Sequence, residues 1–321
     1  MSLTTTSSSS GAVISGKIAS RVAPLGRIDR PFKGILLLMS STVFLASSDA
    51  MAKYLAKSLP PVEIAWLRFA IFILIMAVVM LRHPRALKSL DPGIQILRAL
   101  AMLTSSLFFI TGLQYLPIAE ASATAFIAPI FVTGLSIAFL GEKVGKRRWI
   151  ATLVGLAGVL IIVRPGTAAF HPAAILPILS ALGWACTLVL TRRISGRDSV
   201  VTTMSYAAIV CFMVLSAVVP LVWVTPTWQQ VAIGACIGIA ATTGHWIVVL
   251  AFRYADASVL APFSYSQLVW VTLLGLAMFG EVPDVWTIAG AAVIIASGLY
   301  TAHRERVRRI AMLAVEQSPN V

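Results

Sequence analysis

The chain has 321 residues, of which 59% are hydrophobic and only 12% charged, and its mean hydropathy is +0.91. A soluble domain carries about 25% charged residues. The composition therefore excludes an ordinary soluble domain and predicts an integral membrane protein. The net charge of +13 suggests a nucleic-acid partner at first sight, but the positions of the charges along the chain argue against one.

Residues 1–33 are rich in Ser and Thr and then basic, which predicts a disordered cytoplasmic tail and not a cleaved signal peptide. Ten apolar runs follow, each long enough to cross a bilayer core of about 30 Å. These predicted spans are 34–56, 62–81, 94–115, 118–140, 147–164, 172–192, 200–223, 229–252, 256–279 and 284–302. Residues 303–321 form a short basic tail. The expected fold class is an all-α membrane protein with ten transmembrane helices.

The Lys and Arg residues indicate the orientation of these spans. With the N-terminus inside, the cytoplasmic segments carry 21 of the 25 basic residues. The outer side carries the other four, which are Lys53, Lys57, Arg68 and Arg164. This is the positive-inside pattern. It predicts a multi-pass protein of the cytoplasmic (inner) membrane with both termini in the cytoplasm, lipid around it and no nucleic-acid partner.

The chain also repeats itself. At an offset of 139 residues, Leu113–Phe139 aligns with Phe252–Met278 without a gap, and Gly141-Glu142 falls on Gly280-Glu281. A chance match between apolar helices is the alternative to a true duplication. A duplication predicts the architecture of a secondary transporter, in which the substrate binds near the membrane midplane between the two halves.

The duplication divides the chain into a first repeat over 34–164 and a second over 172–302, each with five spans. Because five is odd, the second repeat lies upside down in the membrane. Small residues in spans five and ten predict close helix packing, and we interpret those spans as scaffold. The residues are Gly155, Gly158, Gly290, Ala291 and Gly298.

The Gly-Glu pairs that precede these spans are also interpreted as structural. Glycine suits the left-handed conformation that ends a helix. The carboxylate after it can cap or neutralise the start of the next helix. A proton-carrying role for the glutamates is the less favoured alternative.

Charged residues at membrane depth mark either a pathway or an ion pair, because burying charge in hydrocarbon is costly. Asp49 and Lys53 lie one helical turn apart on the same face of span one, and Arg68 enters span two from the same outer side. They are expected to form one cluster at the outer mouth. A structural salt bridge and a gate or substrate-steering relay both remain open. Arg98, near the cytoplasmic face, is expected to snorkel to the headgroups.

Uncharged polar residues occur at matching depths in spans three and eight. Ser105 lies in the middle of span three, and the matching region of span eight holds His245 and Trp246. Such a coincidence is expected of a site between two halves. Serine can instead bond to its own helix carbonyl. Histidine titrates near neutral pH, so proton coupling and neutral packing both remain open for His245.

Span nine carries a polar and aromatic run that includes Pro262, Tyr265 and Gln267. Pro262 can kink the helix where a cavity or a neighbour satisfies the freed carbonyl. Phe126 in span four pairs with Tyr265 across the repeat, and Trp184 in span six is expected at a similar depth. These rings can stack on a planar ligand or simply pack in the core.

These features resemble the drug/metabolite transporter superfamily, specifically its members with two EamA-type repeats. The resemblance covers about 34–302 and rests on the ten spans, the paired Gly-Glu junctions, and the Trp149…Gly158 and Trp286…Gly298 segments. Asp49, Lys53, Arg68 and the 262–267 run look like a branch that includes riboflavin and S-adenosylmethionine uptake carriers. Amino-acid exporters share the same fold.

The resemblance implies a secondary transporter that moves a small organic metabolite by alternating access. We expect uptake of riboflavin or a similar heteroaromatic vitamin, with S-adenosylmethionine uptake, amino-acid or metabolite export, and more remotely a passive channel as alternatives. The residues expected to bind substrate are Ser105, Phe126, Trp184, His245, Trp246, Tyr265 and Gln267. Asp49, Lys53 and Arg68 are expected to form the gate or charge cluster.

No catalytic or nucleotide-binding motif stands out, such as H-E-x-x-H, G-x-S-x-G or G-x-x-x-x-G-K-[ST]. We therefore expect no enzymatic activity, no cofactor and no metal site. The energy coupling, the direction of transport and the oligomeric state stay open, and a monomer is compatible with the sequence.

Overall fold

The computed structural model describes residues 30–83, 87–140, 146–167, 170–194, 197–251, 254–255 and 257–317. This part of the chain contains helices and no strand, which confirms the predicted all-α class. The long helices are α2 (Pro31–Leu55), α3 (Pro61–Arg82), α4 (Pro92–Gly112), α5 (Ile118–Ala125), α6 (Ala128–Leu140), α7 (Lys146–Val163), α8 (Ile175–Ile194), α9 (Val200–Val218), α10 (Trp228–Ala251), α11 (Ala257–Ser264), α12 (Ser266–Phe279) and α13 (Val285–Gln317). The short helices η2 (Pro172–Ala174) and η3 (Val219–Leu221) precede α8 and follow α9.

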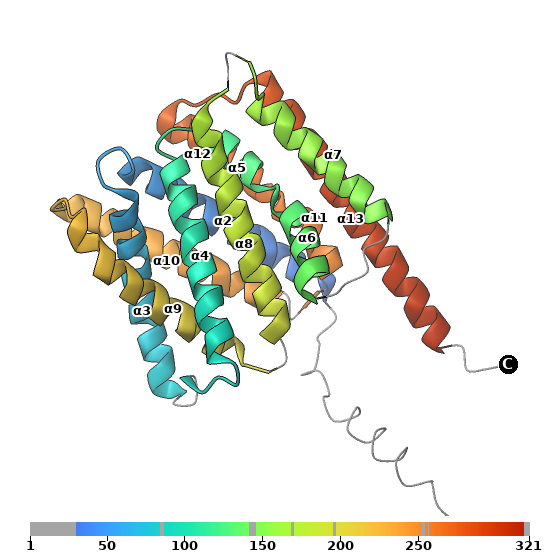
Figure 1. Cartoon of the computed structure of the whole chain (residues 1–321), viewed down its shortest axis with the longest axis horizontal. Coiled ribbons are helices and arrows are strands. Elements are labelled where there is room, and N and C mark those ends of the chain that lie inside the picture. The colour runs from blue at the N-terminus through green and yellow to red at the C-terminus, as the bar shows by residue number, and fades with distance from the viewer. Residues whose placement is uncertain are drawn as a thin grey trace, which may run out of the picture.

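Seven helical stretches of the described chain are long and apolar enough to cross a membrane. Three shorter apolar helices occupy the places predicted for spans five, nine and ten: Trp149–Val163, Ser266–Phe279 and Val285–Tyr300. The structure is therefore that of a multi-pass membrane protein, and the count of ten spans stays a prediction. The predicted tail after residue 302 is helical through Gln317, so that α13 runs past the end of α7 (Figure 1). The predicted tail before residue 30 and the Gly141-Glu142 junction lie outside the described residues.

The predicted spans four and nine are both broken, and at matching places. Span four consists of α5 and α6 with the break at Phe126, and span nine consists of α11 and α12 with the break at Tyr265. Pro129 accounts for the first break, because its ring would clash with the carbonyl of Ala125, where α5 ends. Pro262 lies inside α11, three residues before the second break. Both repeats therefore have the break at the same place, although the proline lies after the break in the first repeat and before it in the second.

The main contacts between the helices are kept when the two halves are exchanged. Helix α2 packs on α10, and its counterpart α8 packs on α4. In the same way α2 contacts α12 while α8 contacts α6, and α3 contacts α10 while α9 contacts α4. The pairs α3–α9 and α7–α13 are their own counterparts. The contacts therefore follow an approximate twofold relation between the halves.

Glycines allow α7 and α13 to touch backbone to backbone, and the two helices lie side by side at one edge of the molecule (Figure 1). A Cβ added to Gly158 would lie 2.9 Å from the carbonyl oxygen of Gly290, and one added to Gly290 would lie 2.5 Å from that of Gly158. Small residues permit such contact where packing, and not the hydrophobic effect, must hold helices together. The predicted close packing of these two helices is confirmed.

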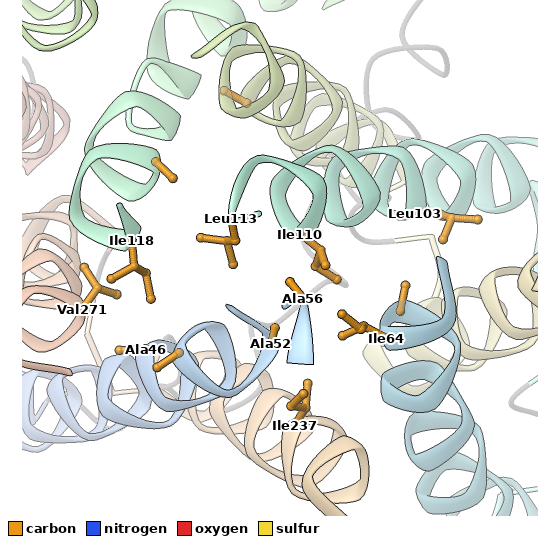
Figure 2. Close-up of a cluster of buried hydrophobic side chains, with 14 of the residues drawn as sticks. Ala46, Ala52, Ala56, Ile64, Leu103, Ile110, Leu113, Ile118, Ile237 and Val271 are labelled. Atoms are coloured by element: carbon orange, nitrogen blue, oxygen red, sulfur yellow. The ribbon is translucent and has the colours of Figure 1, made fainter. Parts of the chain in front are cut away.

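The centre of the bundle is filled by small and branched side chains from both halves. Ala46 and Ala52 of α2 lie in one cluster with Ile64 of α3, Ile237 of α10 and Val271 of α12 (Figure 2). Alanines on α2 let its neighbours approach closely, and the branched side chains fill the remaining space. This core fixes the positions of the helices that surround the cavity described below.

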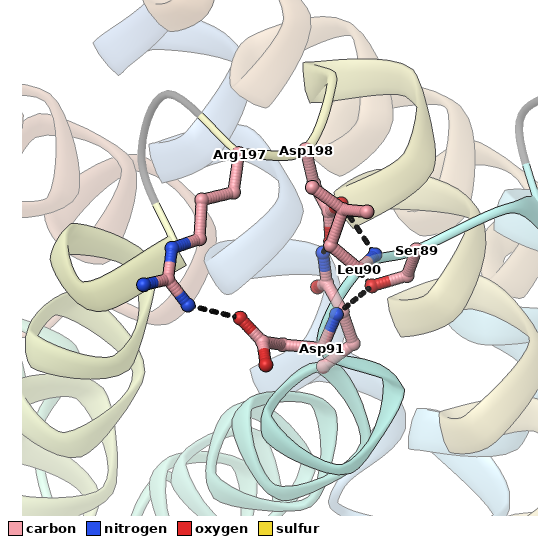
Figure 3. Close-up of polar contacts among 6 residues, drawn as sticks. Ser89, Leu90, Asp91, Arg197 and Asp198 are labelled. Carbon is pink, nitrogen blue, oxygen red and sulfur yellow. Dashed lines mark hydrogen bonds and ion pairs between the residues drawn. The ribbon is translucent and has the colours of Figure 1, made fainter.

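A cluster of hydrogen bonds and one ion pair joins the two halves at the end of the bundle where α4 begins (Figure 3). One carboxylate oxygen of Asp198 accepts hydrogen bonds from the Ser89 hydroxyl and from the side-chain amide of Gln95, the latter at 2.8 Å. Its other oxygen accepts the backbone N–H of Leu90 at 3.0 Å. Beside this cluster, Arg197 pairs with Asp91 at 2.6 Å. The connection between α8 and α9 is thereby tied to the start of α4.

Candidate functional site

A cavity of about 600 Å³ lies between the two halves. Binding pockets for small molecules measure roughly 300–1,000 Å³, so that a metabolite of ordinary size fits. The described lining comes from both halves, including α2, α3, α4 and α7 of the first and α8, α10, α12 and α13 of the second. Eight of the ten side chains that the sequence singles out line it: Asp49, Arg68, Ser105, Phe126, Trp184, His245, Tyr265 and Gln267.

A carboxylate and a guanidinium face this cavity. Asp49 of α2 is partly buried, and one of its oxygens accepts a hydrogen bond from the side-chain amide of Gln267 on α12, at 3.1 Å. Arg68 of α3 attracts Asp49 electrostatically. Within the described residues Arg68 makes neither a hydrogen bond nor an ion pair in direct contact. The two charges therefore share the cavity without neutralising each other by contact.

The rings in the cavity form two pairs, each joining the two halves of the chain. The ring centroids of Phe126 and Tyr265, at the two helix breaks, lie 5.0 Å apart with the planes tilted by 32°. Those of Trp184 on α8 and His245 on α10 lie 6.3 Å apart with a tilt of 33°. Stacking and tilted ring arrangements at these separations are favourable. The rings leave a largely apolar lining that suits the flat part of a ligand.

Serine hydroxyls in the cavity divide into two kinds. The Ser105 hydroxyl is hydrogen-bonded to that of Ser180 at 3.2 Å and so helps to hold α4 against α8. The buried hydroxyls of Ser106 and Ser122 also belong to lining residues, yet no group in the described chain bonds to them. Unpaired buried hydroxyls are costly unless a ligand or water satisfies them. The sequence gives no signal for Ser122 beyond its place one turn before Phe126.

Lys53 does not join Asp49 and Arg68, so the predicted three-residue cluster is wrong. Its ammonium group forms an ion pair with Glu281 and donates a hydrogen bond to the carbonyl oxygen of Leu116 at 2.7 Å. Lys53 lies one turn, about 6 Å, further along α2 than Asp49. Its long side chain is directed to the loop between α4 and α5 and not back toward the cavity.

At the Gly280-Glu281 junction the carboxylate caps a different helix from the one expected. Gly280 has φ of 67° and ends α12 in the left-handed conformation, which confirms that part of the prediction. Glu281 accepts the backbone N–H of Ile118 at 3.0 Å, at the start of α5 in the other half. Helix α13 is capped instead by Asp284, which accepts the N–H of Thr287 at 2.7 Å.

Two further residues lie elsewhere than expected. Trp246 is 48% exposed and is absent from the cavity lining. Neighbours on a helix point about 100° apart, so that Trp246 turns away when His245 faces the cavity. Arg98 does not snorkel to the headgroups, because its guanidinium donates to the Thr191 hydroxyl at 2.7 Å and to the carbonyl of Thr203 at 3.4 Å. It therefore ties α4 to α8 and α9.

The sequence of this chain matches the model of the EamA-like transporter family twice, over residues 32–164 and 171–302. The chain belongs to the EamA-like transporter family. This confirms the resemblance to EamA-type members of the drug/metabolite transporter superfamily. The two matches also assign one family domain to each half of the cavity.

Relatives of this EamA-like transporter are named after different substrates. The chain is 29% identical to an S-adenosylmethionine uptake transporter of Rickettsia prowazekii (strain Madrid E), over 85% of its own length and 93% of the relative. It is 30% identical to a riboflavin transporter of Vibrio cholerae serotype O1, over 83% and 92%. It is 27% identical to a pseudopaline exporter of Pseudomonas aeruginosa (strain UCBPP-PA14), over 82% and 93%.

A solved crystal structure of a protein that is 19% identical matches this EamA-like chain with a TM-score of 0.59, over 86% of this chain and 98% of the other. At that identity the likeness concerns the fold alone. The family, the relatives and the apolar helices together establish a transporter that crosses the membrane several times.

Proposed function

We propose that this EamA-like chain is a secondary transporter of a small organic metabolite, working by alternating access. In this proposal, ten spans form two inverted five-span repeats over 34–164 and 172–302. The observation that carries the proposal is the central cavity, which is lined from both halves and is large enough for a metabolite. A binding site between two repeats is what alternating access requires, because rocking one half against the other exposes the site to each side in turn.

The proposed setting is the cytoplasmic membrane, with both termini in the cytoplasm. On that orientation the cavity reaches the cytoplasmic ends of two helices, because Thr152 near the start of α7 and Arg192 near the end of α8 belong to its lining. The Lys53–Glu281 pair lies at the ends of helices assigned to the outer side. We therefore propose that the cavity faces inward in this conformation.

We propose that the Lys53–Glu281 pair holds the outer side closed. It joins α2, through Lys53, to the α12–α13 junction, while Glu281 also holds the start of α5. Outward opening would separate these elements and break the pair. Lys53 thus keeps the role in an outer gate that the sequence suggested, with Glu281 as its partner. Asp49 and Arg68 are assigned to the cavity instead.

For the substrate we propose a metabolite with a flat heteroaromatic ring, and the sequence favours riboflavin or a similar vitamin, taken up. The two ring pairs around the cavity support this class. S-adenosylmethionine is a second candidate, because it adds charged groups that Asp49 and Arg68 can bind. An exporter of amino acids or other metabolites and, more remotely, a passive channel are the competing functions.

Reconstituted protein in proteoliposomes tests this function. We expect saturable uptake of labelled riboflavin or S-adenosylmethionine, and acceleration by unlabelled substrate inside the vesicles, which a channel does not give. Tyr265→Ala and Trp184→Ala should abolish flux while the protein still inserts. Ile239→Ala, at an exposed position on α10, is the matched control. Linear, non-saturable flux would identify a channel, and unchanged flux in both variants would rule out the proposed cavity site.

A further inference from the structure

Asp49 and Arg68 differ from the three pairs of opposite charges in the described chain that touch. Lys53 with Glu281, Arg164 with Asp284 and Arg197 with Asp91 each form an ion pair in direct contact. Asp49 and Arg68 form no such pair, although both line the same cavity. Charges at membrane depth are retained only where something compensates them. Here the compensation is incomplete within the protein.

The Asp49 carboxylate is held in place from the second half of the chain. The side-chain amide of Gln267 donates to one of its oxygens at 3.1 Å. In the described part of the chain no donor reaches its second oxygen. An amide donor orients a carboxylate without neutralising it. Asp49 is therefore fixed as an acceptor that faces the cavity.

The Arg68 guanidinium supplies the opposite charge. A guanidinium has several N–H donors in a planar fork that matches a carboxylate. Within the described residues none of these donors is used in a hydrogen bond. Arg68 thus provides an anion-binding group within the cavity that also holds Asp49. Asp49 and Arg68 together supply one negative and one positive charge, and Arg192 near the end of α8 adds a second positive charge to the lining of the cavity.

Resting on the proposed carrier function, we propose that Asp49 and Arg68 form a zwitterion subsite. Arg68 binds a substrate carboxylate, Asp49 binds a substrate ammonium group, and the ring pairs hold a flat aromatic portion of the same molecule. The hydroxyls of Ser106 and Ser122, which lack partners in the described chain, line the same cavity and offer further hydrogen bonds. The substrate class is an aromatic or heteroaromatic α-amino acid or a conjugate of one. The subsite thus favours S-adenosylmethionine or an amino acid over the riboflavin that the sequence favours, because an uncharged ring compound would leave both charges without a partner.

Pairs of compounds that differ by one charged group test the subsite. Tryptophan carries both charges, tryptamine lacks the carboxylate, and indole-3-propionate lacks the ammonium group. S-adenosylmethionine and its decarboxylated derivative form a second pair. Binding to purified protein is measured by the shift in unfolding temperature and, in proteoliposomes, by competition and counterflow. We expect the complete zwitterion of at least one set to bind about tenfold or more tightly than the compound that lacks a charge.

Variants of Arg68 and Asp49 test which charged group of the substrate each residue binds. Arg68→Gln should remove the preference for the carboxylate-bearing compound, Arg68→Lys should restore part of it, and Asp49→Asn should remove the preference for the ammonium group. Arg193→Gln changes an exposed charge on α8 outside the cavity and should change neither preference.

The outcomes separate the subsite from the carrier function. Saturable flux without any discrimination between the paired compounds would overturn the subsite and leave the carrier. Selective binding without flux would retain the subsite and overturn the carrier. If neither set binds, or if riboflavin alone binds, the zwitterion proposal is wrong. The discrimination is measured first on the wild-type protein, so the test stands even where a variant fails to fold.

Discussion

The rings of Phe126 and Tyr265 lie 5.0 Å apart although the two residues belong to different repeats. Each residue marks the break in its own span, so that the contact joins two interrupted helices at the depth of the cavity. Behind this contact Tyr265 packs on α13, where a Cβ on Gly298 would overlap the phenol ring. The pair therefore connects the lining of the cavity to the scaffold.

This contact predicts different outcomes for two replacements of Tyr265. Tyr265→Phe should keep near wild-type transport, because no hydrogen bond of the phenol hydroxyl is found within the described residues and the ring contact is retained. Tyr265→Ala should abolish transport, because both the contact with Phe126 and a wall of the cavity are lost. Initial uptake rates in proteoliposomes measure the difference. Equal loss in both variants would show that the ring alone is not sufficient and that the hydroxyl is needed.

The close approach of Tyr265 to α13 predicts that Gly298→Ala destabilises the protein. Overpacking of this kind costs about 1–3 kcal/mol. Gly134→Ala is the matched control, because a Cβ there meets no atom within 4 Å. In that helix interior the alanine should be neutral or stabilise by up to about 1 kcal/mol. Denaturation midpoints in detergent compare the two, and equal midpoints would contradict the predicted clash.

Breaking the Lys53–Glu281 pair should cost far more than breaking an exposed pair. The side chains of Lys53 and Glu281 are only 8% and 24% exposed. Removing one partner of a buried pair costs roughly 3 kcal/mol or more, so we expect about that loss for Lys53→Met or Glu281→Gln. The double variant should recover part of it.

The control is the Arg197–Asp91 pair, whose side chains are 61% and 30% exposed. Exposed pairs contribute less than about 1 kcal/mol. Double-mutant cycles on chemical denaturation measure both pairs. A coupling energy at Lys53–Glu281 no larger than that of the control would argue against a closing role for this pair.

Asp198 predicts an acid-sensitive contribution to stability. Burial alone would raise the pKa of this carboxyl, but hydrogen bonds from Ser89, the Leu90 backbone and Gln95 outweigh it and hold the pKa below the usual 3.8. A group whose pKa is lowered on folding stabilises the protein above its unfolded pKa. That contribution is lost as the pH falls below 3.8 through the folded pKa.

The comparison of wild type with Asp198→Asn isolates this group from the other carboxylates. Wild type should unfold at the higher temperature at pH 7, and the gap should narrow as the pH falls below about 4. Unfolding temperatures in detergent across this range provide the measurement. A gap that stays constant with pH would show that the Asp198 carboxylate gains nothing from its partners.

Much of the fold can be predicted from the internal repeat and from short local motifs. The offset of 139 pairs Phe126 with Tyr265, although it does not reveal that each lies at a helix break, and the small residues of spans five and ten touch at Gly158 and Gly290. Gly280 ends its helix in the left-handed conformation. These features are local or repeated, so that one sequence contains enough information to predict them.

The errors concern directions and partners. A period of 3.6 residues separates His245 from Trp246 by about 100°, and only tertiary packing decides which of them faces the cavity. Lys53 shares a helix face with Asp49, but its flexible side chain is long enough to reach Glu281 instead. The Ser122 hydroxyl is significant because it lacks a partner among the described residues, which no sequence pattern reveals.

Each of three helices in the first half has its main packing partner in the second half, which has a consequence for biogenesis. Helix α2 has its main partner in α10, α4 in α8, and α7 in α13. When the ribosome has inserted the helices up to α7, none of these three partners has yet been made. The early helices must therefore stay in the bilayer without their main partners until the second half is inserted. The packing of the first half is therefore completed only when the second half of the chain has been made.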